Sequence, residues 1–240
     1  MNRPLFFLHI PKTAGTSLRI ALEGLYKPNE ILPDRLMMQR SGGHYPPDII
    51  PAFSLKYQRE AVRLVRGHYH FCLSDLMDDP LIITVLREPV ARTISNLRHL
   101  TRGRDKSNVM RALSEGRLPI ENNLMTRYLG DNVDPLSPTR NRRDFLDGPI
   151  ADPAALLESA KRRLSKIQCL GVVEQMDAFV DLLGAYGISV ELGRSNVAPD
   201  EEFPLDGTQM ETIRRHNELD AELYRAAVAT IASRRMTQVA

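Results

Sequence analysis

Residues 8–17 (LHIPKTAGTS) constrain the fold of this chain more than any other stretch. The apolar run from Leu5 to Ile10 predicts a buried strand, and residues 16–25 carry apolar side chains at helical spacing. Their junction, with one lysine, one glycine and three hydroxyl residues, therefore lies at a helix N-terminus. Free backbone N–H groups and the helix dipole favour a bound phosphate or sulfate there. The alternative is an ordinary strand-to-helix turn with a surface lysine.

A second strand-to-helix junction follows further along the chain. Residues 80–86 (PLIITVL) predict another buried strand, and the proline that begins residues 89–100 predicts the start of a helix. Arg87 lies at the end of the strand, and Ser95 lies on the helix. A guanidinium binds phosphate oxygens in pairs, and a hydroxyl adds a further hydrogen bond. The junction therefore predicts a second anion site, unless Arg87 forms an ion pair with Glu88 or another acidic neighbour at the helix start.

Two histidines lie between these junctions. Residues 62–71 (VRLVRGHYHF) predict a strand that runs into a polar end, where a period of two would place His68 and His70 on one face. Three interpretations are open, namely a catalytic base, a pair of metal ligands and a solvent-facing pair. The sequence offers no third metal ligand at convincing spacing.

Two of these segments match motifs of one enzyme family. Residues 11–17 (PKTAGTS) resemble the 5′-phosphosulfate loop of sulfotransferases that use 3′-phosphoadenosine-5′-phosphosulfate (PAPS), in the form found in carbohydrate enzymes. They differ from a Walker A loop because the lysine comes before the glycine. Residues 87–95 (REPVARTIS) match the 3′-phosphate pattern R-[DE]-P-x-x-R-x-x-S of the same enzymes. The chain thus resembles a bacterial member of this family, similar to heparan sulfate 2-O-sulfotransferase.

The resemblance implies roles for individual residues. Lys12 and His68 are expected to be catalytic. Lys12 would stabilise the negative charge that develops on the leaving group. His68 would be the base, because a histidine-bearing H-G-H segment supplies the base in uronyl 2-O-sulfotransferases. Arg66 replaces the first histidine of that segment, which puts a uronic acid acceptor in doubt. The expected donor-binding residues are Lys12, Thr13, Ala14, Gly15, Thr16, Ser17, Arg87, Ser95 and Asn196. Expected on the acceptor side are His70, Arg66 and Arg127, although Arg127 is equally explained as a structural arginine that satisfies nearby carbonyls.

Alternating strands and helices predict a three-layer α/β/α fold with a mainly parallel sheet, and the resemblance implies the P-loop-like sulfotransferase form of it. We expect one domain over residues 1–240, with irregular acceptor-side segments near 27–61 and 101–150. The charged residues 101–118 form either a mobile lid or a solvated helix. The arginines within 131–149 either bind an anionic acceptor or belong to a solvated loop.

Composition narrows the class of partner. A net charge of +2 over 240 residues is too small to indicate nucleic acid as the main partner. The two cysteines, Cys72 and Cys169, do not make a disulfide framework, and no apolar run reaches the length of a membrane span. We also find no signal peptide, so we expect a cytoplasmic protein.

We therefore expect a sulfotransferase that moves the sulfuryl group of PAPS to a hydroxyl of a carbohydrate or glycolipid. The expected mechanism is in-line displacement with a histidine base and no metal, which leaves adenosine 3′,5′-bisphosphate. One alternative is a P-loop-like kinase or phosphotransferase, which would want a magnesium carboxylate where the second strand ends in Arg87. The other is a non-catalytic nucleotide- or sulfoglycan-binding module, which the presence of Lys12 and His68 disfavours. The sequence does not indicate the oligomeric state.

Overall fold

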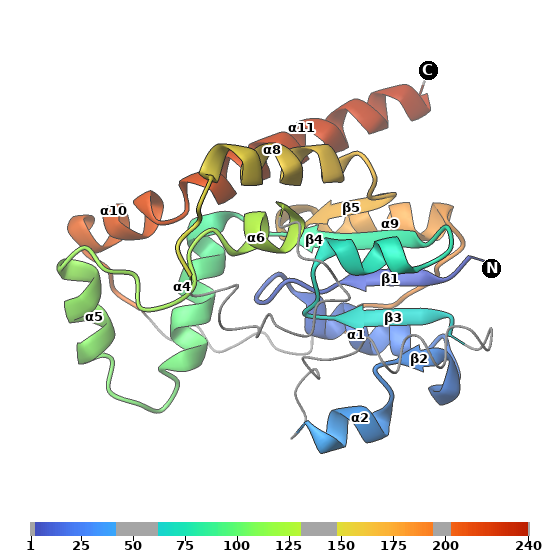
Figure 1. Cartoon of the computed structure of the whole chain (residues 1–240), viewed down its shortest axis with the longest axis horizontal. Coiled ribbons are helices and arrows are strands. Elements are labelled where there is room, and N and C mark those ends of the chain that lie inside the picture. The colour runs from blue at the N-terminus through green and yellow to red at the C-terminus, as the bar shows by residue number, and fades with distance from the viewer. Residues whose placement is uncertain (1–2, 42–61, 131–147, 194–202, 240) are drawn as a thin grey trace.

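A five-stranded sheet forms the centre of the protein (Figure 1). The computed structural model describes residues 3–41, 62–130, 148–193 and 203–239. The strands follow the order β2-β3-β1-β4-β5, and every described pairing is parallel. They are β1 (Leu5–Leu8), β2 (Ile31–Leu32), β3 (Leu64–Gly67), β4 (Leu81–Leu86) and β5 (Cys169–Val172).

The strands are apolar because both faces of the sheet are covered. All residues of β1 and β4 are buried, which is typical of parallel sheets with helices on both sides. Successive side chains point to opposite faces. Leu5 and Phe7 therefore join one hydrophobic cluster, and Phe6 and Leu8 join the other.

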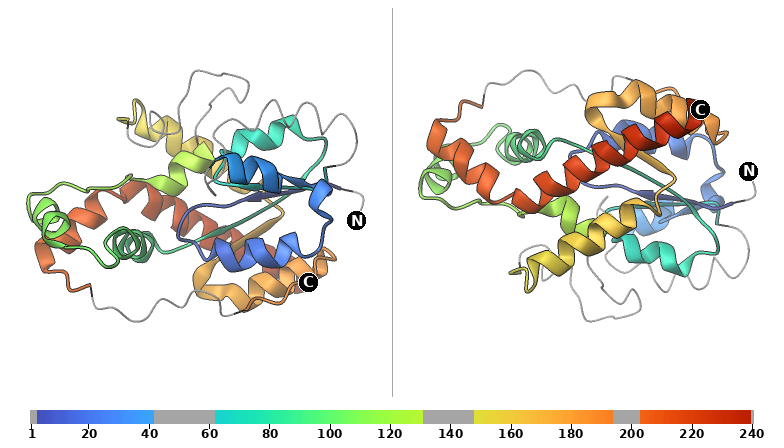
Figure 2. Two further views of the ribbon diagram at one scale, coloured as in Figure 1. Left: turned by 90° about the horizontal axis from the view of Figure 1, so that it is seen from below. Right: turned by 90° about the horizontal axis from the view of Figure 1, so that it is seen from above.

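Helices cover the two faces (Figure 2). One face carries α1 (Gly15–Glu23) and α9 (Met176–Ala185). The other carries the short helix η2 (Phe71–Leu76), α6 (Leu124–Gly130), α8 (Pro153–Leu164) and α11 (Glu218–Val239). The predicted three-layer α/β/α class with a parallel sheet is therefore confirmed.

A third group of helices lies beyond the carboxyl ends of the strands (Figure 1). It consists of α4 (Pro89–Leu100), α5 (Ser107–Ser114) and α10 (Gly207–Arg215), which share a small cluster around Leu97, Leu113 and Ile213. Thr212 on α10 donates a hydrogen bond from its hydroxyl to the Leu113 carbonyl at 2.9 Å. These contacts favour a packed helix over a mobile lid at residues 107–114.

Two predictions of local structure are wrong in detail. The strand expected to reach Ile10 ends at Leu8, because its partner β3 ends at the paired residue Gly67. Residues 27–41 are not irregular: they contain η1 (Pro28–Glu30), β2 and α2 (Arg35–Arg40). Residues 42–61, and residues 131–147 with the arginine-rich loop, lie outside the described residues. In the described part of the chain, no helix has the length and apolar character needed to cross a membrane.

Two helices far apart in the sequence cap each other's N-termini. The carboxylate of Asp220, in the first turn of α11, accepts hydrogen bonds from the backbone of Met125 at 3.1 Å and Thr126 at 2.7 Å. In return, Asn123 Oδ1, before α6, accepts the backbone N–H groups of Leu219 at 3.0 Å and Asp220 at 3.2 Å. Each side chain satisfies donors that a helix cannot satisfy itself, so the two caps fix α6 against α11.

We predict that Asn123→Gly lowers the free energy of unfolding by about 2 kcal/mol or more, because two N–H groups lose their acceptor. Asn123 has φ 46°, a conformation that glycine adopts without strain, so the variant isolates the loss of the cap. Urea denaturation gives the measurement. Asn29→Gly, at an exposed asparagine of η1, is the control and should cost no more than about 1 kcal/mol. Equal losses in the two variants would contradict the capping role.

Candidate active site

Three loops meet at the carboxyl edge of the sheet, because β1 pairs in parallel with β3 on one side and β4 on the other. The backbone N–H of His9 donates to the Gly67 carbonyl at 2.9 Å, which ties the loop after β1 to the end of β3. Arg87 Nη1 donates to the Lys12 carbonyl at 3.2 Å, which ties the same loop to the end of β4. The two predicted anion motifs therefore belong to one site.

The N-terminus of α1 is open to an anion. Its N-cap residue, Ala14, has a left-handed backbone with φ 59°, and no side chain caps the helix. The first turn of α1 also holds no acidic residue. In contrast, carboxylates accept N-terminal N–H groups of five other described helices: Asp34 for α2, Glu88 for α4, Asp220 for α6, Asp152 for α8 and Asp206 for α10. The free N–H groups and positive dipole end of α1 are thus left for a ligand.

The loop that leads into α1 is held from beneath. The buried Thr13 donates from its hydroxyl to the Ile10 carbonyl at 2.9 Å, so this hydroxyl shapes the loop. Ala14 and Thr16 are exposed, and Ser17 is half-buried. Exposed residues on a fixed turn give the loop an outer surface on which an anion can lie.

Gly15 is required by the residue beneath it. A Cβ at this position would lie 2.0 Å from Cδ2 and 2.2 Å from Nε2 of the His9 ring, closer than any side chain could stand. His9 is buried, stacks on Phe7 with ring centroids 5.2 Å apart, and lies 4.4 Å from the His68 ring. The imidazole of His9 therefore forms the floor under the start of α1.

Positive charge gathers at this edge. Burial lowers the pKa of Lys12, and the charges of Arg102 and Arg87 lower it further. The pKa of His99 on α4 is also lowered, chiefly by the charge of Lys12 and then by burial and Arg102. Burial likewise lowers the pKa of Arg87. Cations that depress one another's pKa values favour a bound anion between them.

Arg87 does not form the ion pair with Glu88 that was the alternative. The Glu88 carboxylate instead caps α4, where it accepts the backbone N–H groups of Val90 at 3.1 Å and Ala91 at 2.7 Å. Among the described residues, Arg87 has no ion-pair partner and donates only to the Lys12 carbonyl. Ser95 lies half-buried two turns into α4, where no described group hydrogen-bonds to its hydroxyl. Both side chains therefore have hydrogen-bond donors with which to bind a phosphate.

His68 has a defined tautomer. Its Nδ1 lies 2.5 Å from the His9 carbonyl oxygen, which is an acceptor only, so Nδ1 carries the proton. In the neutral ring the lone pair is then on Nε2. This arrangement suits a general base, because the backbone orients the ring and fixes the tautomer whose lone pair is on Nε2.

His70 does not share a face with His68, contrary to the period-two expectation. The strand ends at Gly67, whose φ of 154° breaks the alternation, and His70 is then the N-cap residue of η2. The His70 ring lies 5.7 Å from the ring of Tyr128 on α6, whereas His68 lies against His9. The described residues contain no group of three His, Cys, Asp or Glu side chains arranged to hold a metal ion.

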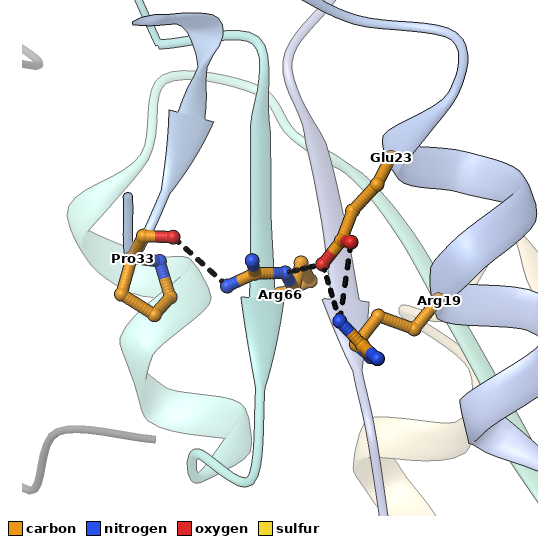
Figure 3. A network of polar contacts seen from close by, with 4 residues as sticks. All are labelled: Arg19, Glu23, Pro33 and Arg66. Atoms are coloured by element: carbon orange, nitrogen blue, oxygen red, sulfur yellow. Dashed lines mark hydrogen bonds and ion pairs between the residues drawn. The ribbon is translucent and has the colours of Figure 1, made fainter. Parts of the chain in front are cut away.

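Arg66 points into the protein (Figure 3). Its Nε lies 2.5 Å from Glu23 Oε1, and its Nη1 donates to the Pro33 carbonyl at 3.0 Å. Glu23 also accepts from Arg19 at 3.0 and 3.1 Å. The buried guanidinium therefore joins β3 to α1 and to the chain after β2. This placement argues against the acceptor role that was expected of Arg66.

Arg127 is likewise placed as a structural arginine. Its Nε donates to the Asn122 carbonyl at 3.0 Å, and its Nη2 donates to Asn122 Oδ1 and the Gly148 carbonyl, both at 2.7 Å. These bonds support the alternative in which it satisfies nearby carbonyls. Asn196 lies outside the described residues, so its expected contact with the donor has no structural description.

Sequence analysis assigned no role to His9. The available signal was a histidine at the end of a strand whose other residues are all apolar, followed six residues later by a glycine. A polar ring at such a position is buried with the strand, and the glycine gives it room. The long-range contact with His68 left no sequence signal.

The candidate site does not coincide with the cavity that lies elsewhere in the protein. A cavity of about 700 Å³ lies instead between β5, α9 and the end of α11, where Phe179, Leu182 and Ile231 are among its lining residues. It contains none of the residues of the two anion motifs. The edge with Lys12 and Arg87 is the better candidate because binding an anion requires cations and free N–H groups rather than volume.

The sequence matches no protein-family model and no curated protein. Among solved structures, the chain is similar to the crystal structure of a sulfotransferase from Alicyclobacillus acidocaldarius. The two share 17% sequence identity and a TM-score of 0.48, over 95% of this chain and 96% of that chain. At this identity and TM-score, the similarity assigns neither an activity nor a ligand to this chain.

The burial of His9 predicts a pH-dependent stability. Burial lowers the pKa of His9 well below its usual value, and the charges of His68, Arg19 and Arg66 act in the same direction. Below about pH 6.5, His9 therefore binds a proton in the unfolded chain but not in the folded protein. The free energy of unfolding consequently falls as the pH falls, by up to about 1.4 kcal/mol per pH unit.

Urea denaturation at a series of pH values from neutral to mildly acidic gives the slope. We predict a shallower slope for His9→Asn than for the unchanged protein, whatever the two stabilities are at neutral pH. His216→Asn, at the C-terminal end of α10, is the control for the loss of a histidine and should change the slope less than His9→Asn does. A slope that His9→Asn leaves unchanged would show that His9 is protonated in the folded state.

Proposed function

We propose that this protein is a PAPS-dependent sulfotransferase that transfers a sulfuryl group to a hydroxyl of a carbohydrate or glycolipid. The observation that supports this most is the hydrogen bond from Arg87 to the Lys12 carbonyl. It places a guanidinium without a carboxylate partner beside a helix N-terminus without a carboxylate cap. A donor that carries one phosphate on each side of a nucleoside needs such a pair of anion sites.

The described residues fit the donor. The free N–H groups at the start of α1 would hold the 5′-phosphate, and Arg87 with the Ser95 hydroxyl would hold the 3′-phosphate. The proposed donor-binding residues are Lys12, Thr13, Ala14, Gly15, Thr16, Ser17, Arg87, Ser95 and Asn196. Among them, Thr13 and Gly15 act by shaping the loop, because the Thr13 hydroxyl is bonded within it and Gly15 gives room to His9.

PAPS supplies an activated sulfuryl group. In the proposed transfer, a bond forms between the acceptor oxygen and sulfur while the bond from sulfur to the phosphate oxygen breaks. His68 Nε2 takes the proton of the acceptor hydroxyl, and the electron pair of the broken bond goes to the leaving phosphate. Lys12 stabilises the negative charge that develops there, a task for a fixed cation in a partly dry site.

The acceptor side is a finer proposal. The segments near 27–61 and 101–150 of a single domain would contribute to it, with His70 at its border. Arg66 and Arg127 are left out, because their guanidinium groups are bonded inside the fold. A kinase would instead require a carboxylate for magnesium after β4, where this chain has Arg87 and a Glu88 that is occupied as a helix cap.

The donor proposal predicts a strong dependence on the 3′-phosphate. Arg87→Ala should weaken the binding of adenosine 3′,5′-bisphosphate by about 2 kcal/mol or more. The binding of adenosine 5′-monophosphate should change much less, because this nucleotide lacks the 3′-phosphate that Arg87 would bind. Isothermal titration calorimetry measures both. Arg104→Ala, at an exposed arginine beyond α4, is the matched control and should leave both affinities unchanged. Tighter binding of ATP with magnesium than of the bisphosphate would instead support the kinase.

The two catalytic roles are separable. Lys12→Ala should lower kcat by roughly 10²–10³, the cost of losing one fixed donor to a developing charge. His68→Ala should lower it by roughly 10²–10⁴ and should remove the acidic limb of the pH–rate profile, because a neutral imidazole is no longer needed. Sulfate transfer from labelled PAPS to a glycan or glycolipid acceptor gives the rates.

His216→Ala serves as the control for the histidine, since His216 bonds to the Gly116 carbonyl and belongs to neither anion motif. His68→Ala should also leave the affinity for adenosine 3′,5′-bisphosphate nearly unchanged. An equal loss of affinity and turnover would place His68 in the donor site rather than at the acceptor hydroxyl. Full turnover without His68 would assign the base to another group.

A further inference from the structure

The carboxylate of Glu174 connects the 3′-phosphate motif to the C-terminal helix. Glu174 lies in η3 (Val173–Gln175), directly after β5. Its Oε1 accepts the backbone N–H of Glu88 at 3.0 Å, and its Oε2 accepts the hydroxyl of Tyr224 on α11 at 2.8 Å. Burial and this carboxylate raise the pKa of Tyr224, so the phenol stays a donor. Glu174 is therefore fixed at both oxygens.

Fixing Glu174 keeps Arg87 available. Among the charges that act on Arg87, Glu174 exerts the largest effect and raises its pKa, yet the two side chains form no ion pair. Released from one of its partners, this carboxylate would be free to pair with the guanidinium. An Arg87 paired in that way could not bind a phosphate with both nitrogens.

The same helix reaches the motif at a second point. Asp220 lies one turn before Tyr224 on α11, and its charge raises the pKa of Arg92, the second arginine of the motif, against the effect of burial. In return, Arg92 lowers the pKa of Asp220 against the effect of burial. Arg92 has no exposed surface, and Asp220 is also fully buried. Helix α11 is thus linked to the start of residues 87–95 through Glu174, and the charge of Asp220 acts on Arg92 in the middle of them.

We propose that Tyr224 is a positioning residue for the 3′-phosphate of the donor: its hydroxyl holds Glu174 on the Glu88 backbone and away from Arg87. This inference rests on the proposed function. Tyr224 does not touch the nucleotide. It acts through Glu174, which its hydroxyl holds at Oε2.

Tyr224→Phe tests the proposal, because it removes one hydroxyl and keeps the ring. The readout is the ratio of the dissociation constants for adenosine 5′-monophosphate and adenosine 3′,5′-bisphosphate, measured by calorimetry on the full chain. We expect the ratio to fall about three- to tenfold, the scale of coupling between neighbouring groups. Tyr186→Phe, at a partly exposed tyrosine that ends α9, is the matched control and should keep the ratio.

A second variant separates this role from a general loss of packing. Tyr224→Phe combined with Glu174→Gln should restore the ratio to that of Glu174→Gln alone, because a neutral amide cannot form an ion pair with Arg87. The proposal would be overturned if Tyr224→Phe left the ratio of dissociation constants unchanged. It would also be overturned if Tyr224→Phe lowered the ratio and the added Glu174→Gln did not restore it. A ratio near one in the unchanged protein would instead overturn the proposed function itself, so the two failures are distinguishable.

Discussion

The parallel pairing of β1 with β3 on one side and β4 on the other is the constraint on which the candidate site depends. It brings the ends of three strands, and the loops that follow them, to one edge of the sheet. Two hydrogen bonds then fix the loops to one another, from the His9 backbone to the Gly67 carbonyl and from Arg87 to the Lys12 carbonyl. Without this pairing, the two anion motifs and His68 would be separate features of a long chain.

The site is positive because the nearby carboxylates are bonded elsewhere. Glu88 caps α4, and Glu174 is held by the Glu88 backbone and Tyr224, so neither neutralises Arg87. The helix that begins at the site lacks the carboxylate cap that five other described helices have. Lys12 and Arg87 consequently stay without carboxylate partners among the described residues. An arrangement of this kind costs folding stability, and a bound dianion would offset the cost.

The two strand-to-helix junctions were predictable from sequence, because apolar runs, proline and helical spacing are local signals. Side-chain partners were not, since they depend on contacts between residues distant in the chain. Arg66 was expected on the acceptor side but bonds to Glu23 and the Pro33 carbonyl. For Arg127 the sequence left a structural role equally open, and the bonds to Asn122 and Gly148 favour that role. His70 left the face of His68 because β3 ends at Gly67. No local pattern could have revealed the contact between the rings of His9 and His68.

A crystal structure with adenosine 3′,5′-bisphosphate would test the central claim most directly, namely that one edge of the sheet holds both phosphates of the donor. The account predicts the 5′-phosphate on the backbone N–H groups at the start of α1 and the 3′-phosphate on Arg87 and the Ser95 hydroxyl. A nucleotide bound in the cavity between α9 and α11, or bound at the edge with Arg87 facing solvent, would contradict it.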